Sequence, residues 1–131
     1  MKRMCGVLVA LCVMTTLSAQ AQSVGDTETG LAAVYTDSLD GHVTASGQIY
    51  DKTRLTAAHK ALPFGTTIKV TNPKNGKSVV LRVNDRGPVQ AGRILDISPA
   101  AAARLGFSSQ VMRDVTLEVV QVGSGKTTRQ P

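Results

Sequence analysis

Val83-Asn84-Asp85-Arg86-Gly87-Pro88, residues 83–88, is the stretch that says most about the fold. A run of apolar, mostly β-branched residues ends there at residues that favour turns. We therefore expect a strand to stop and the backbone to bend where Asp85 and Arg86 stand. A carboxylate at a strand end on a rigid scaffold can serve as an acid–base catalyst, or it can only form the turn. The stretch alone leaves both interpretations open.

A β-hairpin is expected just before this turn. Residues 67–71 alternate polar and apolar side chains, residues 79–83 do so in part, and Asn75-Gly76 lies between them. Further strand candidates are residues 31–36, 94–97 and 115–122. Several short strands with one or two short helices predict a compact β-barrel.

One helix is well marked after the turn. Ser98 can cap it, Pro99 fits its first position, residues 100–105 favour helix, and Gly106 ends it. Its small alanine face indicates close packing against a sheet. A second helical turn is expected over residues 53–58.

The first 21 of the 131 residues have the layout of a secretory signal peptide. A positive start at Lys2 and Arg3 is followed by an apolar run at 7–14 and an Ala-x-Ala site at 19–21. The apolar run is too short to span a membrane. We therefore expect an exported protein that is cleaved after Ala21. The remaining length allows one domain, at 31–122, with a flexible leader at 22–30 and a flexible tail at 123–131.

Both cysteines, Cys5 and Cys12, lie in the segment that would be removed, so disulfides and thiolate chemistry are not expected. Lipid attachment is not expected either, because Leu11 precedes Cys12 where lipoprotein signals need a small residue. Cleavage removes two positive charges from a formal net charge of +6 and leaves +4. A mildly basic surface suits an anionic polymer such as a cell wall. The basic residues are spread along the chain, and we expect no nucleic-acid partner.

Five ordered motifs carry polar residues between apolar ones in ways that packing alone does not require. They are Thr-Ala-Ser-Gly-Gln at 44–48, Leu-Thr-Ala-Ala-His at 55–59, Leu-Pro-Phe-Gly-Thr at 62–66, Val-Asn-Asp-Arg-Gly-Pro at 83–88 and Gly-Arg-Ile-Leu-Asp-Ile-Ser at 92–98. In this order and spacing they resemble the catalytic domain of the rare lipoprotein A family. The resemblance spans roughly residues 31 to 122.

The resemblance implies a six-stranded double-psi β-barrel and peptidoglycan glycan strands as the partner. Members of the family are lytic transglycosylases or close relatives without demonstrable activity. In such an enzyme one carboxylic acid protonates the departing glycosidic oxygen. The sugar's own 6-hydroxyl then attacks, leaving a 1,6-anhydro end, and the same residue takes up the hydroxyl's proton.

The resemblance places the catalytic Asp at Asp85 and an active-site histidine at His59. A turn-forming aspartate and a buried histidine bonded to backbone stay open as alternatives. Gln48 stands where the family usually has Glu, and Gln cannot ionise. If that group supports acid–base work, we expect activity to fall by on the order of 10²–10⁴.

Ser46, Arg86 and Asp96 are the candidate substrate contacts. Arg86 could bind a carboxylate of the peptide stem or pair with Asp96, and Asp96 could tie the two psi loops together through backbone amides. Two separated histidines and scattered acids lack the spacing of metal ligands, so neither a metal nor another cofactor is expected.

A non-catalytic, expansin-like module that binds or remodels the wall is the rival hypothesis. Gln48 favours it, whereas intact Asp85 and His59 favour the enzyme. A cellulose-binding version is disfavoured because sugar platforms are aromatic, and after cleavage the chain would have no Trp and four aromatic rings. We expect a monomer.

Overall fold

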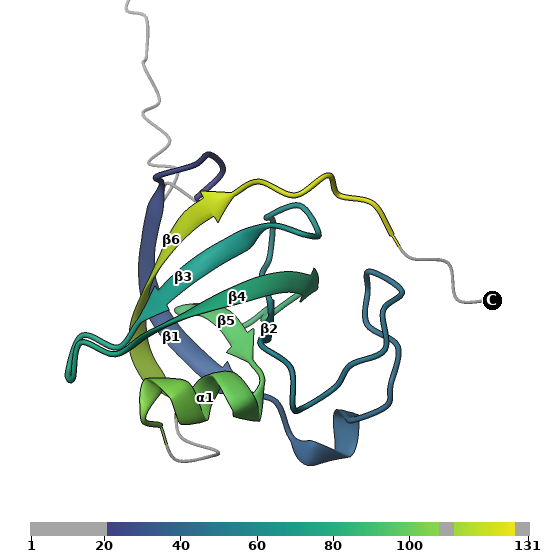
Figure 1. The fold of residues 1–131 in the computed structure, drawn as a ribbon, viewed down its shortest axis with the longest axis horizontal. Coiled ribbons are helices and arrows are strands. Elements are labelled where there is room, and N and C mark those ends of the chain that lie inside the picture. The colour runs from purple at the N-terminus through teal and green to yellow at the C-terminus, as the bar shows by residue number, and fades with distance from the viewer. Residues whose placement is uncertain (1–20, 108–111, 128–131) are drawn as a thin grey trace, which may run out of the picture.

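The computed structural model describes residues 21–107 and 112–127, so apart from Ala21 the expected signal peptide lies outside the described residues. In this part of the chain, six strands close into a barrel in the order β1-β5-β2-β4-β3-β6 (Figure 1). The strands are β1 (Thr27–Val34), β2 (Thr56–Ala58), β3 (Thr67–Thr71), β4 (Ser78–Asp85), β5 (Arg93–Ile97) and β6 (Arg113–Gln121). Two short helices, η1 (Asp37–Leu39) and α1 (Pro99–Leu105), complete the fold. The expected mainly β barrel is confirmed.

The central hairpin forms where the sequence predicts it. β3 and β4 pair antiparallel from Thr67 opposite Arg82 to Thr71 opposite Ser78. Alternate residues of β4, Val79, Leu81 and Val83, are buried in the core, as the two-residue period of a strand requires. β4 then continues to Asp85, so the strand carries that carboxylate to the rim of the barrel.

Two parallel pairings bring the strand ends of the site together. β1 runs parallel to β5, and β2 runs parallel to β4 and antiparallel to β5. Ala58 of β2 therefore lies opposite Asp85 on one side and Asp96 on the other. With strands about 4.8 Å apart, the two aspartates stand roughly 10 Å apart at their Cα atoms, across a small side chain.

The helical turn expected at residues 53–58 is wrong. Thr56–Ala58 form β2, because backbone hydrogen bonds to β4 and β5 on both sides outweigh a weak local helix preference. The boundary of the expected leader also moves. β1 begins at Thr27 because residues 27–30 pair with β6, from Glu118 back to Val115.

The start of the expected tail is held against the loop before β3. The Gly123 amide donates to Thr66 Oγ1, and the Gly125 amide donates to the Phe64 carbonyl, each at 3.0 Å. Residues 123–126 therefore run beside the loop that joins β2 to β3 (Figure 1).

The helix α1 has the caps that its sequence predicts. Ser98 Oγ accepts from the Ala101 amide at 3.2 Å and donates to the Arg54 carbonyl at 2.5 Å. At the other end, Gly106 is left-handed, and the side-chain amides of Asn72 and Asn75 both donate to the Leu105 carbonyl. The hairpin turn thus satisfies the end of the helix that packs against β4.

We predict that Ser98→Ala lowers the free energy of unfolding by about 1–2 kcal/mol, because a buried cap and a buried donor are lost together. Urea denaturation would measure this. Ser78→Ala, at an exposed strand start, is the matched control. An unfolding midpoint shared by Ser98→Ala and the control would contradict the prediction.

Candidate active site

The carboxylate of Asp85 is the most connected polar group at the rim of the barrel. Its Oδ2 accepts from the Tyr35 hydroxyl at 2.6 Å, and its Oδ1 accepts from the backbone amides of Ala45 and Arg86 at 2.9 Å each. These donors come from the end of β1, from the loop at residues 40–55 and from the turn after β4. The Asp85 side chain therefore links these three segments by hydrogen bonds.

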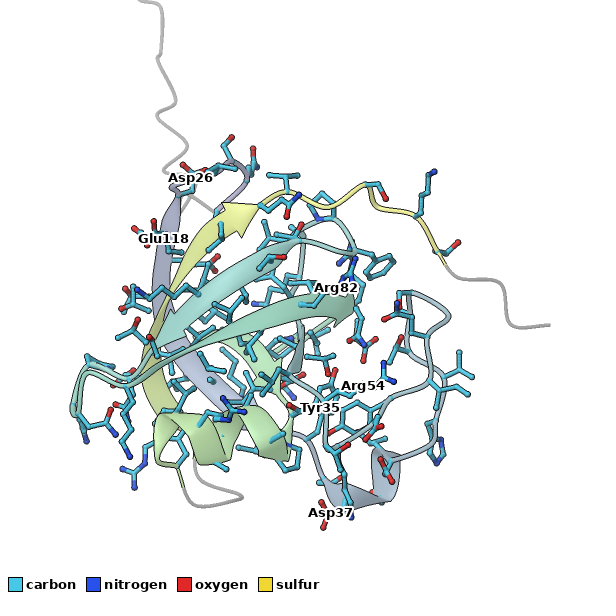
Figure 2. All side chains as sticks on the ribbon, in the orientation of Figure 1. Asp26, Tyr35, Asp37, Arg54, Arg82 and Glu118 are labelled. Carbon is cyan, nitrogen blue, oxygen red and sulfur yellow. The ribbon has the colours of Figure 1, made fainter. Side chains whose placement is uncertain are left out.

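Tyr35 is held as a permanent donor to Asp85. Its ring packs on Tyr50, with centroids 4.7 Å apart and planes tilted by 41°. Burial raises the pKa of the Tyr35 hydroxyl far above its ordinary value, and the hydrogen bond to Asp85 raises it further. The phenol consequently stays protonated, and Figure 2 shows it below the end of β4.

Asp96 is the second carboxyl group of this rim. Burial raises its pKa above the ordinary value, Arg93 opposes the shift, and the charge of Asp85 adds to it. Gly87 lies beside it, with a φ of +128° that L side chains rarely adopt, and a Cβ there would be in ordinary contact with Asp96 Oδ2 at 3.4 Å. Among the described residues, Asp96 has no side-chain hydrogen bond to a psi-loop amide.

An irregularity in β4 shapes the rim. Ala57 pairs with Val83 and Ala58 with Asp85, so the register shifts by one residue at Asn84. Such bulges re-aim the side chains that follow them and occur often beside active sites. Here both Val83 and Asn84 are buried, and Asp85 comes next at the open end.

The hydrogen bonds of His59 are those of a buried histidine bonded to backbone groups, the alternative that the sequence left open. Its side chain is 1% exposed, and Nδ1 accepts from the amides of Ala61 and Leu62, each at 3.0 Å. Nε2 must then carry the proton, which it donates to Glu28 Oε2 at 3.0 Å. Both ring nitrogens are occupied by protein groups, so His59 orders the turn after β2.

Arg86 is also tied to the protein. Its Nη1 donates to the carbonyls of Leu62 at 2.7 Å and His59 at 3.4 Å, and its guanidinium lies 4.0 Å from the Phe64 ring centroid. An ion pair with Asp96, which the sequence left open, is not formed among the described residues. Arg86 therefore supports the 59–64 loop beneath the rim.

The loop that carries Ser46 and Gln48 closes over β4. The Ser46 amide donates to the Asn84 carbonyl at 3.3 Å, and the buried Ser46 hydroxyl bonds Thr44 Oγ1 at 2.9 Å. Gln48 lines a groove of about 620 Å³ together with Asn84, Thr56 and Arg82. The structure thus brings Gln48 beside Asn84, the neighbour of Asp85 in β4.

In residues 21–107 and 112–127, no three His, Cys, Asp or Glu side chains are grouped so as to hold a metal ion. No helix in those ranges has the length and apolar character needed to cross a membrane.

Sequence reasoning missed the partners that fix the candidate residues. From the sequence, Tyr35 counts only as one of the four aromatic rings, and Glu28 falls in the expected leader at residues 22–30. The strand pairing that places each of them depends on β6 and β5, far along the chain. Tyr35 could have been found by looking for a polar group at the end of each expected strand, because it lies at the end of the strand expected at residues 31–36.

Comparison with known proteins places this barrel in a family. The family model described as lytic transglycolase matches residues 27–119. The endolytic peptidoglycan transglycosylase RlpA of Vibrio cholerae is 50% identical over 98 residues, which cover 75% of this chain and 37% of that protein. A probable endolytic peptidoglycan transglycosylase RlpA of Synechocystis is 48% identical over 92 residues, covering 70% of this chain and 29% of the relative. The chain thus spans well under half the length of these two curated relatives.

Solved structures agree on the fold. A papain inhibitor from Streptomyces superposes with a TM-score of 0.60 at 24% identity, covering 77% of this chain and all of the inhibitor. The apo expansin of Clavibacter michiganensis gives a TM-score of 0.57 at 26% identity, covering 76% of this chain and 53% of the expansin.

We predict that Glu28→Gln makes stability less dependent on acid pH. The hydrogen bond from His59 lowers the pKa of Glu28 below its ordinary value of 4.5, so this carboxylate stabilises the fold above that pH. The contribution is lost as pH falls through the lowered value. The difference in unfolding free energy between wild type and variant should therefore shrink on acidification from pH 7 to pH 3, as urea titrations would measure. A difference that stays constant over that range contradicts the prediction; Glu118→Gln, which removes an exposed charge from β6, controls for net charge.

Proposed function

Because the chain belongs to the rare lipoprotein A family of double-psi β-barrels, we propose that it is an exported lytic transglycosylase acting on peptidoglycan. The bond cut is the glycosidic bond from N-acetylmuramic acid to N-acetylglucosamine. The relatives' names support the reaction class. The observation that carries the proposal is the Asp85 carboxylate at the open rim, oriented by Tyr35 and Ala45 with Asp96 beside it.

Asp85 acts first as a general acid in this proposal. As the bond between the muramoyl C1 and the glycosidic oxygen breaks, the Asp85 carboxyl gives its proton to that oxygen, and positive charge develops at C1. The Tyr35 hydroxyl and the Ala45 amide stabilise the carboxylate that remains. In the proposal, these two donors hold the Asp85 carboxylate within hydrogen-bond reach of the glycosidic oxygen.

The same carboxylate then acts as the base. The muramoyl 6-hydroxyl oxygen attacks C1, the C1–O6 bond closes the 1,6-anhydro ring, and Asp85 takes the hydroxyl proton. The proton given in the first step is recovered in the second, so no water and no second catalytic carboxylate are consumed. A single aspartate therefore suffices, provided that it starts protonated.

Asp96 is the neighbouring carboxyl group in this proposal. Two neighbouring carboxyl groups of like charge do not both ionise readily, so a pair can hold one proton where an isolated acid would lose it. Asp96 has the raised pKa that such a pair requires, with burial as the main cause and Asp85 as a contributor.

Gln48 gives the non-catalytic alternative its support. It lines the groove beside Asn84 and cannot ionise, so it contacts sugar by hydrogen bonds alone. A chain with this substitution could bind strands without cutting them. A transglycosylase releases 1,6-anhydro ends and a binding module does not, so an assay of the products separates the two functions.

We predict that the full chain releases 1,6-anhydro muramoyl ends from peptidoglycan sacculi, detected by mass spectrometry. Asp85→Asn should reduce their release by about 10²–10⁴, since the amide neither donates nor takes up the proton. Ser98→Ala, a folded but destabilised protein, controls for indirect effects. Equal product from Asp85→Asn and wild type would remove Asp85 from the mechanism.

Gln48→Glu decides between enzyme and binding module in the same assay. If wild type yields no 1,6-anhydro ends while Gln48→Glu yields them, the present chain is the non-catalytic module and position 48 is the cause. If both yield them, the amide is sufficient and the enzyme proposal stands.

We predict that Tyr35→Phe lowers turnover roughly 10- to 100-fold, the worth of a hydrogen bond to a charged group. Tyr50→Phe is the matched control because its hydroxyl makes no hydrogen bond with a described group. Turnover by Tyr35→Phe equal to that of Tyr50→Phe would show that Tyr35 serves packing alone.

A further inference from the structure

Arg82 lines the groove of about 620 Å³ described above, and the proposed reaction makes no use of it. Its register partners are Thr56 on β2 and Thr67 on β3, so its side chain lies on the outer face of these three strands. It lines the 620 Å³ groove with Gln48 and Asn84, and it also lines two adjoining hollows of about 190 and 470 Å³. The three hollows are thus arranged around one guanidinium group.

The groove is connected to the catalytic rim by the loop that covers it. That loop donates one amide to the Asp85 carboxylate, from Ala45, and the next to the Asn84 carbonyl, from Ser46. Asn84 itself lines the two hollows that also contain Gln48. A polymer cut at Asp85 would therefore continue along Asn84 and Gln48 toward Arg82.

The basic side chains around the groove make this face positively charged, and they have few acidic partners. Within the described residues the Arg82 guanidinium has no ion pair or hydrogen bond. Arg54 shares the larger groove and makes only a 3.7 Å, exposed contact with Asp51, of the kind that contributes little. Lys126 adds a third cation on the tail side. In Figure 2, Arg82 and Arg54 lie on the right-hand side of the barrel, whereas Asp26 and Glu118 lie at the left of the view.

The groove also holds neutral polar groups without partners. Asn84 is 5% exposed, and its side-chain oxygen has no hydrogen-bond partner in the described structure. The Thr56 hydroxyl on the same groove is likewise buried and unpartnered. Buried polar atoms are normally satisfied, so these two oxygens are acceptors that ligand donors in the groove could satisfy. Each has less than 1 Å² of accessible surface, so its side chain has to turn toward the groove to meet a ligand.

We propose that this groove is a subsite for a carboxylate-bearing sugar of the glycan strand, with Arg82 binding the carboxylate. Asn84, Thr56 and Gln48 offer hydrogen bonds to the sugar's hydroxyl and amide groups. The guanidinium fork matches a carboxylate in shape and charge. Arg86, which the sequence suggested for this task, is engaged with the Leu62 carbonyl and the Phe64 ring.

In peptidoglycan this carboxylate has two sources. It is the lactyl group of a muramoyl residue whose peptide has been removed, or it is a carboxylate of the attached peptide. Both present the same chemistry to Arg82. The assignment of the polymer rests on the proposed function, but the prediction about Arg82 is one of binding and needs no turnover.

The test measures binding of the full-length protein to sacculi by co-sedimentation in the cold, where turnover is slow, and keeps Asp85 because its carboxylate holds the loop that covers the groove. Three substrates are compared: intact sacculi, sacculi stripped of peptides by an amidase, and stripped sacculi whose carboxylates have been converted to amides. Arg82→Gln is introduced into this protein, with Arg104→Gln on the exposed face of α1 as the matched control. Thermal melting verifies that each variant folds.

We expect Arg82→Gln to weaken binding about tenfold or more on strands that carry the carboxylate, and to have no effect once it is amidated. A loss confined to stripped sacculi identifies the lactyl group, and one confined to intact sacculi identifies the peptide. Arg82→Lys should recover only part of the affinity, because an ammonium lacks the fork. Binding equal to that of Arg104→Gln, or a loss that persists on amidated strands, overturns the proposal.

The two proposals fail separately. If wild type releases 1,6-anhydro ends and Asp85→Asn does not, yet Arg82→Gln binds as the control does, the subsite is wrong and the reaction stands. If no variant releases product but Arg82 still determines carboxylate-dependent binding, the reaction is wrong and the subsite stands.

Discussion

The carboxylate of Asp85 joins parts of the chain that would otherwise have little contact at the open end of the barrel. Its bonds to Tyr35, Ala45 and the Arg86 amide connect the end of β1, the covering loop and the turn after β4. An acceptor with this many donors holds both the loop and itself in place. The geometry of the rim and the shape of the groove beside it therefore depend on one side chain.

Around that carboxylate the polar groups divide by task. Tyr35 donates a hydrogen bond to Asp85, and the charge of Asp85 contributes to the raised pKa of Asp96. The motifs also mark the buried His59 and the exposed Arg86, which hold the 59–64 loop through backbone carbonyls, amides and Glu28. Arg82 and Asn84 face the groove. Within the motif at residues 83–88, Asp85 thus belongs to the proposed chemistry, Arg86 orders the loop and Asn84 lines the groove.

Local patterns predicted the hairpin, the capped helix and the strand that ends at Asp85, because turn residues, caps and alternation act over a few neighbours. They did not predict β2, which exists only because β4 and β5 lie on either side of it. The same limit hid Tyr35, 50 residues from Asp85, and Glu28, 31 residues from His59. Which candidates touch one another was set by strand order, and no spacing in the chain encodes that order.

The account depends most on Asp85 and Asp96 behaving as one interacting pair. Carbon-13 NMR of the side-chain carboxyls, titrated in wild type and in Asp85→Asn, measures this directly. The pKa of Asp96 should lie above the ordinary aspartate value in wild type. It should fall when the charge at position 85 is removed, while burial keeps part of the increase. An ordinary pKa for Asp96 in wild type, or one that does not respond to Asp85→Asn, would contradict the account.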